Sequence, residues 1–225
     1  MKSSKNYHDL LGTYLPAGLI EACYVSVKCN DPAHNVDHVY NVCAYGLELA
    51  AGKFTKKEIS IILAGCLMHD LGCRYDRETH HQISFGLAFR YLDIHAPKMF
   101  NEQETMLIAK TCYEHRASYK GVHSSVYSEY VALADRGKLD LTDLIDRCMK
   151  ARVAWGVISK EDLVNEIVDH LVDKLSEKTG YMWSSYPEFG FELNKDIIKN
   201  IISVVDNKPL LMSTVKDHVA TNFKG

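Results

Sequence analysis

Histidines and carboxylates that could bind a metal ion gather in the first part of this chain of 225 residues. Eight of the 11 histidines lie between residues 34 and 123. The most informative feature is the pair His69-Asp70, which ends an apolar stretch and would therefore be partly buried. Buried polar side chains need partners, and a metal ion is an efficient one. Imidazole nitrogens with carboxylate oxygens suit manganese, iron, cobalt, nickel, zinc or magnesium, so we expect a divalent metal site here.

Two further segments offer donors of the same kind. His34 and His38 are four residues apart and would share one face of a helix if both were helical. Asp135 ends the apolar stretch 130–134. Each has an ordinary alternative: His34 could be a polar residue of a first helical turn, and Asp135 could cap a segment or pair with Arg136.

In combination, these segments resemble the HD-domain superfamily of metal-dependent phosphohydrolases. The resemblance covers about residues 31 to 140, and its central motif is matched most closely. It is carried by His38-Val39-Tyr40-Asn41-Val42, Leu67-Met68-His69-Asp70-Leu71-Gly72 and Leu133-Ala134-Asp135. The resemblance implies an all-helical fold in which one divalent ion is bound by His38, His69, Asp70 and Asp135.

Several subfamilies add two histidines between the His-Asp pair and the last Asp, and these bind a second ion or the substrate phosphate. His80 and His115 are similar to those two positions, and the motif spacing favours His80 over His81. The arrangement resembles the subfamily that cleaves diadenosine tetraphosphate and the cyclic dinucleotide phosphodiesterases. Many members carry a lysine shortly after the pair, whereas this chain has Cys73 there, followed by Arg74.

The expected function is hydrolysis of a phosphoester or phosphoanhydride bond of a mono-, di- or cyclic nucleotide by a metal-activated water. One or two divalent ions would be bound, with Asp70 bridging two. We expect His115 or His34 to protonate the leaving group, because histidine titrates near neutrality. Three cations close in sequence are expected to bind phosphate: Arg74, Arg116 and Lys120. Two alternatives stay open, namely a di-iron oxygenase with the same ligand set and a non-catalytic nucleotide-binding module.

Composition narrows the class of protein. Hydrophobic residues make up 47% and charged residues 24%, as in ordinary globular domains. A formal charge of -3 gives no basic field for polymeric nucleic acid.

The seven scattered cysteines form no CxxC pair, so we expect them to be reduced residues of the core. No apolar run is long enough for a bilayer. We expect a cytoplasmic protein with a small-molecule nucleotide or phosphoester substrate, and a homo-oligomer stays open.

Apolar residues recur with helical spacing and without strand-like alternation, which predicts an all-α fold. Thr55 and Glu58 form the pattern of a capping box at one helix start. We expect a single domain over 1–225, in which 31–137 form the metal-binding core and 138–225 a helical extension that packs on or covers it. Helices are expected near 17–28, 36–51, 56–70, 81–94, 102–116, 125–136, 140–154, 160–178 and 194–206.

Overall fold

The computed structural model describes residues 1–156 and 159–223. Every regular element in these ranges is a helix, so the all-α prediction is confirmed. The chain divides into two compact units, Met1–Lys138 and Leu139–Gly225, close to the expected start of the helical extension. The expected packing of that extension on the core stays a prediction.

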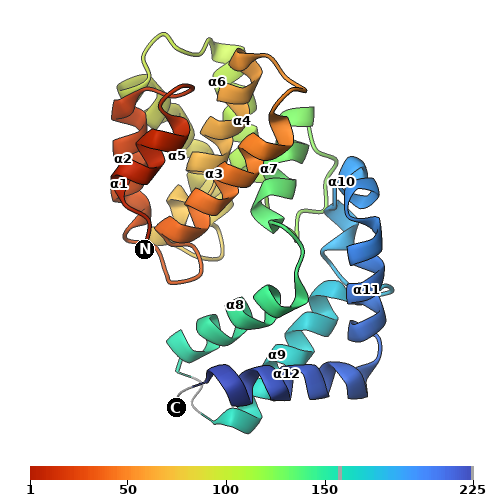
Figure 1. Cartoon of the computed structure of the whole chain (residues 1–225). Coiled ribbons are helices and arrows are strands. Elements are labelled where there is room, and N and C mark those ends of the chain that lie inside the picture. The colour runs from red at the N-terminus through yellow and green to blue at the C-terminus, as the bar shows by residue number, and fades with distance from the viewer. Residues whose placement is uncertain (157–158, 224–225) are drawn as a thin grey trace. The chain divides into compact units, whose positions relative to one another are not determined.

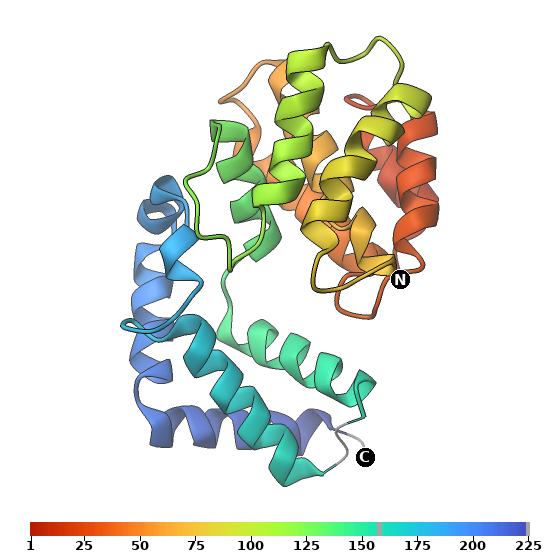
Figure 2. The same ribbon diagram turned by 180° about the vertical axis from the view of Figure 1, so that it is seen from behind.

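The N-terminal unit contains seven α-helices and one short 3-10 helix within its described residues. In both views of the chain, α1 and α2 (red) lie at one edge of this unit and α7 (green) lies at the opposite edge (Figures 1 and 2). The elements are α1 (Ser4–Leu11), α2 (Ala17–Val27), α3 (Val36–Ala50), α4 (Lys56–Met68), η1 (Leu71–Arg74), α5 (His80–His95), α6 (Glu102–Glu114) and α7 (Val126–Arg136).

Helix α4 is the centre of this unit. It packs against α3, α6 and α7, and all ten residues from Ile59 to Met68 are buried. A helix that is apolar on every side is stable only when other helices surround it. Its start is the predicted capping box, in which the Thr55 side chain accepts from the Glu58 backbone and the Glu58 side chain accepts from that of Thr55. Helix α4 therefore ends inside the unit, and His69-Asp70 follows directly.

The C-terminal unit contains α8 (Leu141–Ala154), α9 (Lys160–Leu175), η2 (Trp183–Ser185), α10 (Glu188–Leu193), α11 (Lys195–Val205) and α12 (Lys208–Asn222). Helix α9 contacts α8, α11 and α12. An aromatic cluster follows α9: the ring centroids of Trp183 and Tyr186 are 5.6 Å apart, and those of Tyr186 and Phe191 are 4.9 Å apart. Since Trp183 Nε1 also donates to the Leu175 carbonyl at 2.9 Å, this aromatic segment packs on its own unit.

Two helices of eight or more residues were not predicted from the sequence. Helix α1 is short, and its capping box is formed by Ser3 and Asn6. Helix α12 has a proline, Pro209, in its first turn. A proline there needs no hydrogen-bond partner for its nitrogen and favours helix initiation. All seven cysteines are free, and only Cys29 is exposed. Among the described residues, no helix has the length and apolar character needed to cross a bilayer.

Two glycine substitutions test the packing around α4. A Cβ at Gly65 would lie 2.9 Å from Val131 Cγ2 and would collide with Thr111 Oγ1, so Gly65→Ala is expected to destabilise the fold by about 1–3 kcal/mol. Gly86, on an exposed part of α5, has nothing within 4 Å of its Cβ position. Gly86→Ala is therefore the control and should stabilise by about 0.5–1 kcal/mol. Urea unfolding measures both; equal effects of the two substitutions would contradict the close contact of α4 with α6 and α7.

Candidate metal centre

Metal-donor side chains come from the ends of five helices and meet in the N-terminal unit. Histidine or aspartate stands in the first turn of α3 and at the first position of α5, and also at the ends of α4, α6 and α7. Helix ends leave backbone groups without intrahelical partners, so polar side chains are readily accommodated there. The six donors are His38, His69, Asp70, His80, His115 and Asp135.

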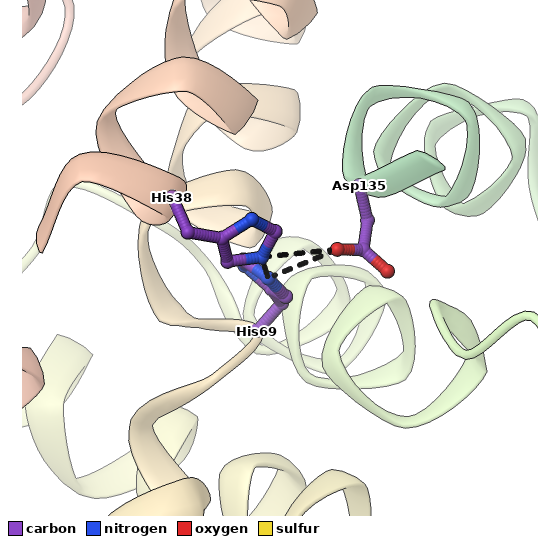
Figure 3. A group of neighbouring side chains, drawn as sticks. All are labelled: His38, His69 and Asp135. Atoms are coloured by element: carbon purple, nitrogen blue, oxygen red, sulfur yellow. Dashed lines mark hydrogen bonds and ion pairs between the residues drawn. The ribbon is translucent and has the colours of Figure 1, made fainter. Parts of the chain in front are cut away.

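The first donor group consists of His38, His69, Asp135 and the Oδ2 atom of Asp70. The Nε2 atoms of His38 and His69 are 3.3 Å apart, and they lie 3.2 and 3.5 Å from Asp135 Oδ1. The same nitrogens lie 3.4 and 3.1 Å from Asp70 Oδ2. Figure 3 shows the two rings and the Asp135 carboxylate facing one another. Residues separated by almost a hundred positions in the chain thus direct their donor atoms to one place.

The second donor group consists of His80, His115 and the Oδ1 atom of Asp70. Oδ1 lies 3.4 Å from His80 Nε2 and 3.6 Å from His115 Nε2, and the two nitrogens are 3.2 Å apart. His69, Asp70 and His115 also lie within one possible metal-binding set. The two donor groups therefore adjoin, and the Asp70 carboxylate belongs to both.

The spacing of the donors fits divalent ions. Four nitrogen or oxygen donors about 2.0–2.1 Å from one ion at tetrahedral angles lie roughly 3.3 Å from one another, and the distances above match this spacing. Asp70 Oδ2 is buried, and its polar neighbours among the described residues are the Nε2 atoms of His38 and His69, which are themselves possible metal donors. Such an atom is costly in a protein interior unless an ion or another partner satisfies it. The residues of both groups therefore fit a metal ion.

Three of the histidines are held in the tautomer that a metal requires. The Nδ1 atoms of His69 and His115 lie 2.8 Å from the carbonyls of Cys66 and Cys112, each three residues earlier. His80 Nδ1 lies 2.7 Å from the Arg77 carbonyl in the same way. Because a carbonyl only accepts, each Nδ1 donates its hydrogen, which leaves Nε2 as the nitrogen that can bind an ion. Hydrogen bonds of this kind orient histidine ligands in metal sites.

Burial and neighbouring charges shift the pKa values of His69 and Asp70 in opposite directions. Burial alone would raise the pKa of Asp70, but the imidazoles around it, His69 first, hold that pKa well below its usual range. Burial alone would lower the pKa of His69, but the Asp70 and Asp135 carboxylates raise it well above its ordinary value. Without an ion, the carboxylates therefore retain a proton on His69. Burial and the neighbouring His115 lower the pKa of His80 to about 3, which keeps that ring neutral.

His34 lies beside the donors without belonging to either group. Its ring centroid is 5.6 Å from that of His38 and 6.3 Å from that of His80. Its Nδ1 atom lies 2.9 and 3.0 Å from the two carboxylate oxygens of Asp31. The carboxylate orients the ring, so Nε2 is the nitrogen available for proton exchange.

The three cations expected at the site are placed differently. Arg74 is exposed, donates to Ser26 Oγ at 3.4 Å and lies over the Tyr75 ring. Arg116 donates to the Glu78 carbonyl at 2.7 Å and directly follows His115. Lys120 is exposed on the segment between α6 and α7, and no ion pair in the described part of the chain joins it to a donor. Arg74 and Arg116 therefore adjoin donor-bearing segments, whereas Lys120 does not contact the donors.

One member of the cluster was not predicted as a ligand. The thiol of Cys73 lies 3.4 Å from Asp70 Oδ1, and Cys73, Asp70 and His80 form a third possible metal-binding set. The sequence contains no cysteine pair with zinc-site spacing, so only the position of Cys73 three residues after Asp70 could have indicated this proximity.

Comparison with known proteins gives no significant match: no family model matches the sequence, and no curated protein or solved structure is significantly similar to it. The buried histidine and aspartate groups are compatible with an HD-type site.

Metal binding should compete with protons at this centre. Since the carboxylates raise the pKa of His69, an ion must displace that proton, and binding becomes weaker as the pH falls. The lowered pKa values of Asp70 and Asp135 keep both carboxylates ionised in this range, so the loss of affinity follows the protonation of His69. Calorimetric titration of the metal-free protein with Zn²⁺, in buffers of different ionisation enthalpy, should show proton release. An affinity that is constant between mildly acidic and neutral pH would contradict the assignment.

Proposed function

We propose that this protein is a metal-dependent phosphohydrolase of the HD-domain type, which binds two divalent ions and cleaves a phosphoester or phosphoanhydride bond of a nucleotide. The observation that carries the proposal is the position of Asp70, whose two oxygens face separate pairs of imidazole nitrogens at 3.1–3.6 Å. A carboxylate shared in this way would be suited to holding two divalent ions, the number that two-metal hydrolases use.

A bound divalent ion supplies Lewis acidity and lowers the pKa of its water towards about 7. The protein supplies position and proton transfer. Asp70 keeps the two donor groups adjacent, and the carbonyl-bonded Nδ1 atoms hold His69, His80 and His115 rigid. A reacting group held between rigid donors loses less entropy on reaching the transition state.

The proton for the leaving group is assigned to His34. Its ring lies next to one histidine from each donor group, and the Asp31 carboxylate holds its Nδ1 side. A histidine paired with a carboxylate through Nδ1 can give a proton from Nε2, with the carboxylate stabilising the charged ring. His115, the other residue considered for this role, directs its Nε2 atom to the second donor group and serves better as a ligand.

An anionic substrate is supported by two cations that lie close to the donors in sequence. Arg74 and Arg116 follow donor-bearing segments directly, and guanidinium groups bind phosphate oxygens in two-pronged fashion. The choice of a nucleotide rests on the HD-domain resemblance alone. Lys120 is left outside the proposed site because it is exposed and has no contact with the donors.

Metal content and turnover of substituted proteins test the proposal. The purified protein should contain two ions per chain, His115→Ala should lose one, and Asp70→Asn should lose both together with activity. His95→Ala, at the other end of α5, is the control and should keep both ions. Elemental analysis should be paired with a screen of mono-, di-, tri-, cyclic and dinucleotides under manganese, iron, cobalt and magnesium.

The screen should be run in air and without oxygen. Hydrolysis needs no oxygen, so equal rates are expected. Iron-dependent turnover that requires oxygen would instead identify an oxygenase. Bound metal without turnover of any phosphoester would favour a nucleotide-binding module.

A second prediction concerns His34 and Asp31. His34→Ala should lower kcat on the order of 10²-fold, because a positioned acid contributes about that factor, while the metal content stays unchanged. Asp31→Asn should lower kcat less, and the double variant should resemble His34→Ala, because Asp31 acts through that ring. Steady-state kinetics with the best substrate of the screen measure this. A loss of metal in His34→Ala would show that the residue is a ligand instead.

A further inference from the structure

We propose that Cys73 is a thiolate ligand of the second ion, together with Asp70, His80 and His115. This inference deepens the proposed function, because it rests on the second donor group, but it does not depend on which reaction is catalysed. Cys73 is 8% exposed, and its Sγ lies 3.4 Å from Asp70 Oδ1. Cys73, Asp70 and His80 each offer a donor atom, and these atoms lie within 4.8 Å of one another.

The distances fit a four-coordinate ion. With sulfur about 2.3 Å and nitrogen or oxygen about 2.0–2.1 Å from zinc, sulfur lies roughly 3.5 Å from the other donors. The observed 3.4 Å between Sγ and Asp70 Oδ1 agrees with this value. Three further distances of the set, 3.2–3.6 Å among Oδ1, His80 Nε2 and His115 Nε2, agree with the spacing of nitrogen and oxygen donors.

Local structure explains why this cysteine faces the donors. Cys73 belongs to η1, and its backbone donates to the Asp70 carbonyl at 3.1 Å. Residues three apart in a 3-10 helix lie above one another, so the side chains of Asp70 and Cys73 share one side. Gly72 brings α5 close, since a Cβ there would collide with the His80 backbone. The Gly72 nitrogen also donates to Ser84 Oγ at 2.9 Å, which fixes the start of α5 against η1.

The Cys73 thiol has a buried carboxylate as its neighbour. Burial and the Asp70 carboxylate raise the pKa of Cys73, so without an ion it is a neutral thiol that donates to Asp70 Oδ1. On binding, the S–H bond breaks, the proton leaves to solvent and the sulfur electron pair forms the bond to the ion, without any change of oxidation state. A thiolate favours zinc, cobalt or iron over magnesium. The first donor group contains only nitrogen and oxygen atoms and lacks this preference.

Cobalt substitution tests the ligand directly. The metal-free full-length protein should bind two Co²⁺ per chain and develop the intense near-ultraviolet absorption of a sulfur-to-cobalt bond. Cys73→Ser should lose this absorption and bind the second Co²⁺ at least about tenfold more weakly, since ligand-sphere changes typically cost 10–100-fold, while the first Co²⁺ is retained. Cys29→Ser is the matched control and should keep the absorption, because Cys29 is the exposed thiol that could bind cobalt adventitiously.

X-ray absorption of the zinc-loaded wild-type protein provides a readout that needs no variant, in case Cys73→Ser does not fold. A sulfur neighbour about 2.3 Å from zinc is expected. The absence of sulfur around zinc at two ions per chain overturns the inference, as does an unchanged cobalt absorption in folded Cys73→Ser. Sulfur coordination without phosphoester turnover would support Cys73 as a ligand and refute the proposed reaction. Phosphoester turnover without sulfur coordination would support the reaction and refute Cys73 as a ligand.

Discussion

The buried carboxylate of Asp70 is the constraint around which the N-terminal unit is organised. It follows a helix that is enclosed on every side, and its side chain is 1% exposed. A negative charge in such a place is strongly unfavourable unless cationic or metal partners surround it. Imidazoles from four helix ends approach its two oxygens. The ends of α3, α4, α5 and α6 thus bring compensating groups to one buried charge.

In this centre, hydrogen bonds at the helix ends both satisfy backbone carbonyls and orient histidine side chains. The last carbonyls of a helix have no intrahelical donor, and those of Cys66 and Cys112 belong to the last turns of α4 and α6. These carbonyls accept hydrogen bonds from the Nδ1 atoms of His69 and His115. The same bonds set the tautomer that presents Nε2 to the cluster. Backbone groups that would otherwise need water therefore help to orient the ligands, and few additional residues are required.

Much of the fold and part of the centre could be predicted from the sequence. Apolar spacing and the Thr55 capping box indicated α4, because both are local properties of the chain. His69 and Asp70 were recognisable because polar residues ended that apolar helix. Helix α12 was missed because a proline permits a first turn as readily as it ends a helix. The position of Cys73 beside His80 could not be predicted, since it depends on a 3-10 turn and on the close approach of another helix at Gly72.

The two donor groups differ in exposure to solvent, and this difference suits one to an open metal site and the other to a closed one. In the first group, the side chains of His38 and Asp135 are 10% and 20% exposed, and the neighbouring His34 is 12% exposed. In the second group, the His80 and His115 side chains are each 3% exposed. Catalytic metal sites keep a position open to water or substrate, whereas sites filled by four protein ligands are closed. With Cys73 as its fourth donor, the second group is suited to holding its ion permanently. Under the proposed function, substrate would approach from the side of His38 and Asp135, where His34 would donate its proton.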